Sequence, residues 1–313
     1  MEEVICPEGL ESDLLPPIQR NLEQIEEVFK LQVSLRGNKI MFSGEGTSIR
    51  HFKKYLNHLF ALADENGRLD ESDIHLSLNL VEEGNLEQIK ENLNRKYSIK
   101  INGRDVFPKT FNQKEYVRSM LNNEVVFSIG PAGTGKTFLA IAMALNSYIN
   151  HKVERIVLTR PVVEAGERLG FLPGDIQQKI NPYLRPLYDA LYYFIGFEKT
   201  SEFIDRGIIE IAPLAYMRGR TINDAFIILD EGQNTVNSQM KMFLTRFGQN
   251  SRVVITADIT QIDLEQPKKS GVLKSIRILK GITGIGIVNL TKKDIVRHPL
   301  VQRIIAAYEA SEK

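Results

Sequence analysis

The pattern of hydrophobic and polar residues changes at about residue 108. Before this point, apolar residues recur at helical spacing, as over residues 17–33, or alternate with polar ones, as over 31–35 and 40–43. After it, short and nearly continuous apolar runs are separated by segments of helical periodicity. Because strands of a parallel sheet covered on both faces lack alternation, residues 108–313 are predicted to form a doubly wound α/β domain.

Strands and helices alternate along the whole of this predicted domain. The strands are predicted at residues 125–129, 154–159, 208–212, 225–229, 252–256 and 285–290. The helices are predicted at residues 136–149, 176–195, 236–247, 270–280 and 294–310. This order favours a parallel sheet, in which each crossover between neighbouring strands carries a helix.

Residues 1–65 are predicted to form a small α+β module of helix, two strands and helix. This order suggests a KH-type RNA-binding module. The KH fold holds the nucleic-acid backbone with a Gly-x-x-Gly loop, and here only Gly44-Glu45-Gly46 is found, with an acidic residue where phosphate would lie. A structural or protein-docking module is therefore an equal alternative. Residues 66–107 are interpreted as a charged helical connector followed by a hairpin.

The distribution of charge changes this picture more than its total. The 313 residues carry a formal net charge of +1, with 42% hydrophobic and 25% charged residues, as in ordinary globular proteins. Residues 1–30 hold eight acidic and two basic residues, whereas residues 267–303 hold nine lysines or arginines against the single Asp294. The second segment is a candidate for contact with a polyanion, and a solvated basic face is the alternative.

Cysteine usage and hydropathy indicate a reducing, aqueous compartment. Cys6 is the single cysteine, which excludes an internal disulfide. The N-terminus lacks the basic start of a signal peptide, and no apolar run approaches the length of a membrane span. We therefore expect a cytoplasmic protein with no membrane contact.

The clearest chemical signal is the run Gly130-Pro131-Ala132-Gly133-Thr134-Gly135-Lys136-Thr137, between a predicted strand and a predicted helix. Its glycines allow successive N–H groups to surround a phosphate chain, and the helix start adds the positive end of its dipole. Lys136 is expected to reach the β- and γ-phosphates, and Thr137 to offer its hydroxyl to Mg²⁺. The run predicts a nucleotide site, against the alternative of a glycine turn that ends in Lys-Thr by chance.

A second part of this site is predicted where strand 225–229 ends. Asp230 and Glu231 follow that buried strand directly. Asp230 is expected to hold Mg²⁺, directly or through water, and Glu231 to polarise the water that attacks the γ-phosphorus. An adjacent pair of carboxylates favours hydrolysis over phosphoryl transfer to a small molecule, because it supplies a base for water.

Three other polar residues are candidates for the same site. If strand 252–256 lies beside the P-loop strand, Asp258 and Gln261 come near the γ-phosphate, where they can report hydrolysis to the rest of the protein. Gln113 precedes the P-loop by about seventeen residues. Its amide can pair with the N6 and N7 edge of adenine, and a surface helix residue is the alternative.

With these residues the chain resembles the PhoH family of ATPases, in its long form with an N-terminal KH-like domain. The similarity covers roughly residues 18–313. It is carried by residues 112–113, 130–137, 159–167, 169–175, 217–221, 230–234, 258–263 and 296–300. The boxes at 230–233 and 258–261 are also similar to those of superfamily 1 helicases, with Ala257 where glycine is usual.

The resemblance implies hydrolysis of ATP with Mg²⁺ linked to RNA metabolism, ring-shaped homo-oligomers such as hexamers, and a partnership with an rRNA-maturing endoribonuclease. An RNA-associated ATPase or helicase-like motor is the first hypothesis, although a superfamily 1 motor has two such cores in one chain and this chain has room for one. The alternative is an ATP-driven switch that docks and regulates a protein partner without remodelling RNA. A small-molecule kinase ranks third, because no acceptor-binding lid is evident.

Arg297 is predicted to supply a positive charge that the other candidates do not provide. P-loop ATPases often neutralise the γ-phosphoryl oxygens with an arginine, sometimes one from a neighbouring subunit. Arg297 lies at the predicted start of the last helix, within one of the family-like runs. Arg218, Arg220 and Arg246 are rival candidates, and a surface or helix-packing arginine is the alternative.

Overall fold

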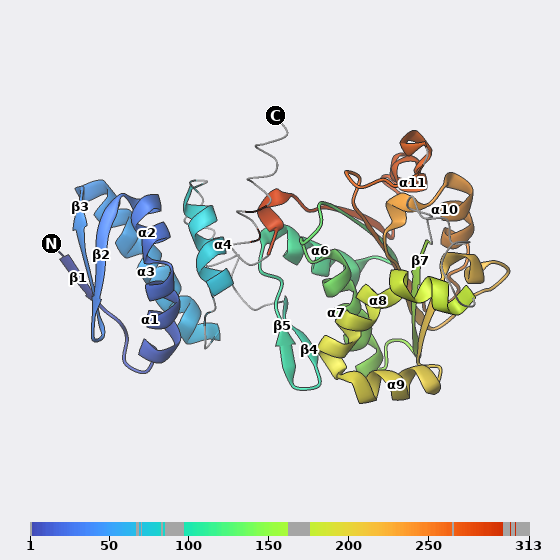
Figure 1. Ribbon diagram of the computed structural model, residues 1–313, viewed down its shortest axis with the longest axis horizontal. Helices are drawn as coiled ribbons and strands as arrows, with labels where there is room; N and C mark the ends of the chain where they lie inside the picture. Colours follow the sequence, from blue (N-terminus) through green and yellow to red (C-terminus); the bar gives the residue numbers. More distant parts are fainter. Residues whose placement is uncertain are drawn as a thin grey trace. The chain divides into compact units, whose positions relative to one another are not determined.

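The described residues form two compact units, one over Met1–Tyr97 with Lys109–Phe111, and the other over Ser98–Pro108 and Asn112–Val296. The computed structural model describes residues 2–66, 69, 71–82, 84, 97–161, 176–264, 266–296, 301 and 304. Both units contain helices and strands (Figure 1). Among the described residues, each helix is too short or too polar to cross a lipid bilayer.

The N-terminal unit is built on a three-stranded antiparallel sheet in the order β1-β3-β2. Its strands are β1 (Glu2–Ile5), β2 (Leu31–Arg36) and β3 (Lys39–Gly44). Its helices are α1 (Glu11–Arg20), α2 (Leu22–Phe29), α3 (Gly46–Asn66) and α4 (Glu71–Glu82). The predicted pair of strands and the helix after them are confirmed, whereas β1 was not predicted.

The single helix predicted over residues 17–33 is wrong, because the chain breaks into two helices at Asn21. Asn21 Nδ2 donates a hydrogen bond to the Pro17 carbonyl at 2.7 Å, which satisfies an acceptor in the last turn of α1. Ile18 and Ile25, one on each side of the break, both point into the core. The helical spacing of apolar residues therefore continues through the break and hides it in the sequence.

An aromatic cluster forms the centre of this unit. Phe52 contacts Phe42 and Phe29 with ring centroids 5.0 and 5.1 Å apart, and Phe29 contacts Tyr55 at 5.1 Å. Ile74 of α4 belongs to the same buried core. Burial of each large apolar side chain contributes about 1.5–3 kcal/mol. Packing of apolar residues against one face of the sheet thus accounts for the stability of this unit.

The second unit contains a six-stranded parallel sheet in the order β11-β6-β10-β9-β7-β8, which confirms the predicted parallel α/β fold. Its strands are β6 (Val125–Ile129), β7 (Arg155–Arg160), β8 (Ile209–Pro213), β9 (Ala225–Leu229), β10 (Arg252–Ala257) and β11 (Ile285–Asn289). The hairpin of β4 (Ile99–Ile101) and β5 (Arg104–Val106) precedes it, as predicted.

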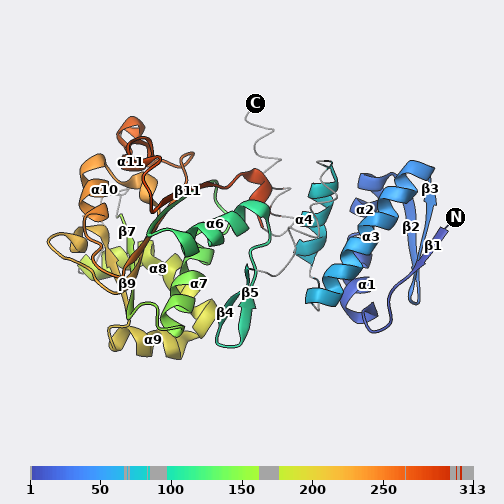
Figure 2. The same ribbon diagram turned by 180° about the vertical axis from the view of Figure 1, so that it is seen from behind.

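Helices lie on both faces of this sheet (Figure 2). They are α6 (Phe111–Asn122), α7 (Lys136–Ile149), α8 (Ile176–Ile195), α9 (Phe197–Asp205), α10 (Asn237–Leu244) and α11 (Gly271–Leu279), with short 3₁₀ turns η3 (Leu214–Met217), η4 (Gly232–Asn234), η5 (Pro267–Lys269) and η6 (Lys292–Asp294). Helix α9 was not predicted. The helix predicted over 294–310 lies largely outside the described residues.

The four central strands of the sheet, β6, β10, β9 and β7, are buried on both faces, as their continuous apolar runs predicted. Alternate residues such as Phe127 and Ile255 pack in one core with Met240 of α10 and Val272 of α11. Helix α7 contacts β7, β9 and β10. Because all six strands are parallel, the segments that follow β6, β9 and β10 leave the same edge of the sheet. Ligand sites of open α/β sheets form at this edge.

Candidate nucleotide site

The loop between β6 and α7 has the backbone geometry of a phosphate cradle. Gly133 and Gly135 both have a φ of 82°, a region that other residues rarely adopt. Gly130 has no room for a side chain, because a Cβ would lie 2.6 Å from the Leu290 carbonyl oxygen. Thr134 Oγ1 donates to the Pro131 carbonyl at 2.9 Å and closes the loop on itself. Its N–H groups thus stand at the N-terminus of α7, where anions bind.

Lys136 and Thr137 extend from this loop in two directions. Lys136 Nζ donates to the carbonyl oxygens of Gly130 and Pro131, at 2.6 and 2.8 Å, so the ammonium group lies over the loop. Thr137 Oγ1 donates to Asp230 Oδ1 at 2.6 Å. This bond joins the P-loop to the residue that follows β9, 93 positions later in the chain. The two predicted halves of the site are therefore in direct contact.

Asp230 is held by groups from two strands as well as by Thr137 of α7. Its Oδ1 also accepts a hydrogen bond from Thr256 Oγ1 of β10 at 2.6 Å, and its N–H donates to the Thr159 carbonyl of β7 at 2.8 Å. Only 3% of the residue is exposed. A buried carboxylate with these partners has one fixed orientation, with an oxygen directed at the Thr137 hydroxyl.

Arg160, the last residue of β7, adds a positive charge that the sequence analysis missed. Its Nη1 lies 3.7 Å from Asp230 Oδ2, and its Nη2 lies 3.7 Å from Glu231 Oε1. Two signals for it were present in the sequence: it lies in the family-like run 159–167, and it is a basic residue at the carboxyl end of a predicted parallel strand, the edge where ligand sites collect. The guanidinium group faces both carboxylates of the site.

Glu231 has an unusual backbone and an altered acidity. Its φ is 53°, which is uncommon for a residue other than glycine. The pKa of its carboxyl group is raised above the ordinary value, first by burial and then by the negative charge of Asp230. Arg160, a hydrogen bond from Gln233 and Lys136 act in the opposite direction. The carboxylate is thus a stronger base than an exposed glutamate.

Gln233 links this base to the segment that follows β10. Its Nε2 donates to Glu231 Oε2 at 2.5 Å and to the Gln261 carbonyl at 3.1 Å. Its Oε1 accepts a hydrogen bond from the Asp258 N–H at 2.9 Å. The sequence analysis did not assign Gln233 a role, although it lies within the family-like run. Both the oxygen and the nitrogen of its amide are used to fix the position of Glu231.

The condition set for Asp258 and Gln261 is met, because β10 pairs with β6 on one side and with β9 on the other, and their approach to the γ-phosphate stays a prediction. Asp258 Oδ1 accepts hydrogen bonds from Thr260 N and Oγ1, at 2.9 and 2.6 Å. Asp258 Oδ2 is buried and has no hydrogen-bond partner within the described part of the chain. The side chain of Gln261 is exposed, and the residue contacts Gln233 through its carbonyl.

Gln113 lies behind the P-loop rather than on the surface, with 4% of the residue exposed. Its Nε2 donates to the carbonyl oxygens of Thr134 and Asp294, at 3.1 and 3.4 Å. In the same helix, Tyr116 Oη donates to the Lys136 carbonyl at 3.2 Å. Helix α6 therefore supports the loop that it precedes. Recognition of adenine by Gln113 stays a prediction.

The arginine candidates differ in what they contact. Arg297 lies outside the described residues, and the N–H of the preceding Val296 donates to the Gly133 carbonyl at 3.1 Å. Arg220 forms two hydrogen bonds with Glu210, and Arg246 donates to the carbonyl oxygens of Met242 and Arg220. Arg218 is exposed. Arg160, rather than any of the rivals, contacts the two acidic residues of the site.

The oxygen atoms at the centre of the site fit Mg²⁺. This ion is usually bound by one or two carboxylates together with phosphate oxygens and water. The Thr137 hydroxyl and the Asp230 carboxylate are 2.6 Å apart and supply two such oxygen ligands. Asp258 Oδ2, which is buried without a partner in the described chain, offers a further acceptor for bound water.

Comparison with known proteins places the chain in a family. A profile described as PhoH-like protein matches residues 105–309. A PhoH-like protein of Bacillus subtilis (strain 168) is 46% identical over 288 residues, which is 92% of this chain and 90% of that protein. A PhoH-like protein of Mycobacterium leprae is 47% identical over 308 residues, covering 98% of this chain and 88% of that protein.

Two other similarities cover less of the chain. Protein PhoH of Escherichia coli (strain K12) is 45% identical over 198 residues, which is 63% of this chain and 56% of that protein. A solved SWI2/SNF2 ATPase core of Sulfolobus solfataricus in complex with dsDNA aligns with a TM-score of 0.35 and 15% identity. The alignment covers 58% of this chain and 44% of that one. From the family profile and the long matches at 46–47% identity, we conclude that the chain belongs to the PhoH-like family and that its second unit is a P-loop NTPase.

Proposed function

We propose that this protein hydrolyses ATP at the P-loop site with Mg²⁺ as cofactor. The observation that carries the proposal is the 2.6 Å hydrogen bond between Thr137 and Asp230, with Glu231 directly after it. A phosphate-binding loop, an oxygen pair suited to Mg²⁺ and a carboxylate of raised pKa meet at one point. Adjacent to a P-loop, such a carboxylate favours water as the acceptor of the γ-phosphoryl group.

The residues of this chain divide the work as follows. The N–H groups of residues 130–137 bind the phosphates, and Lys136 pairs with their negative charge. Thr137 and Asp230 would hold Mg²⁺, which when bound neutralises charge on the phosphate oxygens. Glu231, held by Gln233, accepts the proton of the attacking water. Asp258 and Gln261 sense the γ-phosphate, and the side-chain amide of Gln233 connects them to Glu231.

The function is tested by Glu231→Gln, which keeps the shape of the side chain and removes the base. We expect turnover to fall by roughly 10²–10⁴-fold while ATP binding, measured by fluorescence titration, is retained. Lys136→Ala is the comparison variant, because it should weaken ATP binding as well as abolish turnover. Normal turnover in Glu231→Gln would show that another group is the base.

We extend the proposal to an ATPase that works on RNA as a homo-oligomer, with Arg297 of one subunit reaching the ATP of the next. The basic residues of 267–303 support this extension, and the described lysines among them include the exposed pair Lys268 and Lys269 of η5. Phosphate contacts through such residues make RNA affinity fall steeply with salt. RNA should therefore raise ATP turnover at low salt, and Lys268→Ala with Lys269→Ala should weaken that effect.

A second candidate is an ATP-driven switch that docks a protein such as an endoribonuclease. The acidic residues 1–30 and the lack of a Gly-x-x-Gly run within residues 1–65 favour it. In this case the N-terminal unit serves protein contact. Turnover that is unchanged by RNA across a salt series, yet changed by an added protein partner, would select the switch over the RNA motor.

A further inference from the structure

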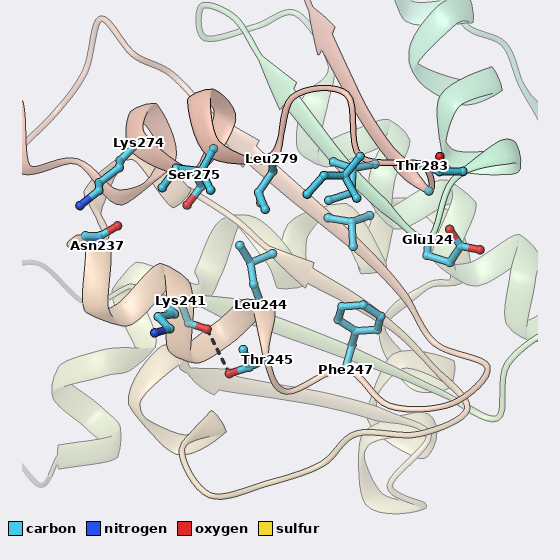
Figure 3. A pocket seen from close by; sticks show the side chains of 15 residues that line it. Glu124, Asn237, Lys241, Leu244, Thr245, Phe247, Lys274, Ser275, Leu279 and Thr283 are labelled. Atoms are coloured by element: carbon cyan, nitrogen blue, oxygen red, sulfur yellow. Dashed lines mark hydrogen bonds between the residues drawn. The ribbon is translucent and has the colours of Figure 1, made fainter.

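A cavity of about 780 Å³ lies between α10 and α11 (Figure 3). Its floor includes Val125 and Ile285, the first residues of β6 and β11, so it opens at the amino end of the sheet, away from the P-loop site. Every residue of its lining belongs to the second unit and is described. The volume is within the range of small-molecule sites, which are mostly apolar with a few placed polar groups.

The two helical walls of this cavity carry the same order of side chains. Along α10 and the residues after it, Lys241 is followed by Leu244 and Phe247, and along α11, Lys274 is followed by Ile278 and then Ile282. Figure 3 shows Lys241 and Lys274 at one end of the cavity, with Leu244 and Leu279 between that end and the far end. The cavity is thus cationic at one end and mainly apolar in its middle, and the Glu124 carboxylate lies at the far end.

Within the described part of the chain, the isoleucines are not fully covered and the lysines are not paired. Ile278 and Ile282 are 62% and 49% exposed, which leaves large aliphatic groups open to water. Within the described residues, the ammonium groups of Lys241 and Lys274 have no ion-pair partner. A ligand with an apolar body and one negative charge would cover the isoleucines and pair with the lysines at once.

The walls of the cavity begin at the segment that holds the proposed base. Ser270 Oγ, at the start of α11, donates to the Gln233 carbonyl at 2.8 Å, and Gly271 N donates to the Thr235 carbonyl at 2.7 Å. Gln233 in turn donates to Glu231. Gly271 has no room for a side chain, because a Cβ would lie 2.8 Å from Met240 Cβ. The starts of α10 and α11 are therefore tightly joined to each other and to this segment.

We propose that this cavity is an effector site for a small apolar carboxylate. The body of the ligand lies against Leu244, Ile278 and Leu279, and its carboxylate lies between Lys241 and Lys274. The binding part stands independently, whereas the effect on turnover rests on the proposed ATPase function. A ligand that moves the walls of α10 and α11 also moves the Gln233 segment, and thus changes the position of Glu231.

Binding is tested with a pair of fluorescent probes that share an apolar body. 8-Anilinonaphthalene-1-sulfonate carries a negative charge, and N-phenyl-1-naphthylamine does not. Replacing both lysines (Lys241→Ala with Lys274→Ala) should lower the affinity for the charged probe by roughly fivefold to tenfold, the scale of two partly exposed ion pairs. The affinity for the neutral probe should not change. Lys280→Ala, an exposed lysine just after α11 and outside the lining, is the matched control.

A second variant tests the apolar wall. Ile278→Asp, at a largely exposed position where folding is not at risk, should weaken both probes. Decanoate should displace the charged probe, whereas 1-decanol, with the same chain and no charge, should be a much weaker competitor. Equal affinity of the charged probe for the wild type and the double-lysine variant, or failure of decanoate to displace it, overturns the site.

The effector role is tested by ATP turnover with and without decanoate. We expect a decrease of roughly fivefold, within the usual range of coupling between two sites, in the wild type and in Lys280→Ala but not in the double-lysine variant. Binding without any change in turnover overturns the effector role alone. A wild type that shows no turnover at all refutes the proposed function, and the probe experiment still decides the binding site.

Discussion

Arginine meets carboxylate at two places in the six-stranded sheet, with different geometry. At the edge strand β8, Arg220 Nη1 and Nη2 lie 2.5 and 2.7 Å from Glu210 Oε1 and Oε2. At the end of β7, Arg160 lies 3.7 Å from one oxygen of Asp230 and 3.7 Å from one oxygen of Glu231. The first is a bidentate ion pair between one arginine and one glutamate. In the second, one guanidinium group is shared between two carboxylates.

The two glutamates also differ in acidity. The hydrogen bonds from Arg220 lower the pKa of Glu210. Burial and the charge of Asp230 raise the pKa of Glu231 in spite of Arg160. A bidentate arginine stabilises the carboxylate and removes its basicity, whereas a more distant one leaves a base that still binds a proton. Burial, a second carboxylate and a longer distance to the arginine, rather than the type of residue, separate the site of Glu231 from the structural pair of Glu210.

Among variants of the two arginines, the largest effect should come from replacing Arg160. Arg160→Ala removes a cation beside the expected γ-phosphoryl group, and we expect turnover to fall by roughly 10²–10³-fold, the usual cost of one charge-stabilising donor. Arg160→Lys should recover part of this loss. Arg220→Ala is the matched control and should turn over ATP like the wild type at temperatures where it is folded. An equal loss of turnover in Arg160→Ala and Arg220→Ala would show that the two arginines do not differ in their role in turnover.

A smaller effect should appear in the pH dependence of turnover. Glu231 acts as a base only when ionised, so turnover should fall as the pH drops through its raised pKa, above the ordinary glutamate value of about 4.3. Arg160 lowers this pKa. In Arg160→Ala the pKa should therefore be higher still, and the residual activity should begin to fall at a higher pH than in the wild type. Rate profiles over mildly acidic pH measure both limbs. If turnover falls at the same pH in the wild type and in Arg160→Ala, Arg160 does not affect the titration of Glu231.

The smallest effect concerns stability. Arg220→Ala should lower the free energy of unfolding by about 1 kcal/mol at neutral pH, the value of a favourable pair that is about one-third exposed. Because the folded pKa of Glu210 is depressed, the contribution is present above the unfolded pKa and is lost as the pH falls through the folded value. Urea denaturation at neutral and strongly acidic pH should show the difference shrinking in acid. A difference that grows in acid would contradict the sign of the shift.

Much of the fold could be predicted because its signals are local. The six strands of the second unit lie within about one residue of their predicted positions, since each is a short apolar run bounded by polar residues. The break at Asn21 and the short strand β1 escaped prediction, because neither disturbs the periodicity of the residues around it. The order of the strands could not be read at all, since it depends on contacts between distant segments.

The sequence by itself determined the phosphate-binding loop and the acidic pair, because each is a run of neighbouring residues whose chemistry depends on backbone conformation and adjacency. Only the tertiary structure decided which groups surround them. Arg160 of β7 and Thr256 of β10 come to Asp230 and Glu231 because β7 and β10 are the two neighbours of β9 in the sheet. Contacts such as that between Thr137 and Asp230 span 93 residues. No local pattern encodes such contacts, because burial of the whole sheet, rather than the propensity of any segment, selects the order of its strands.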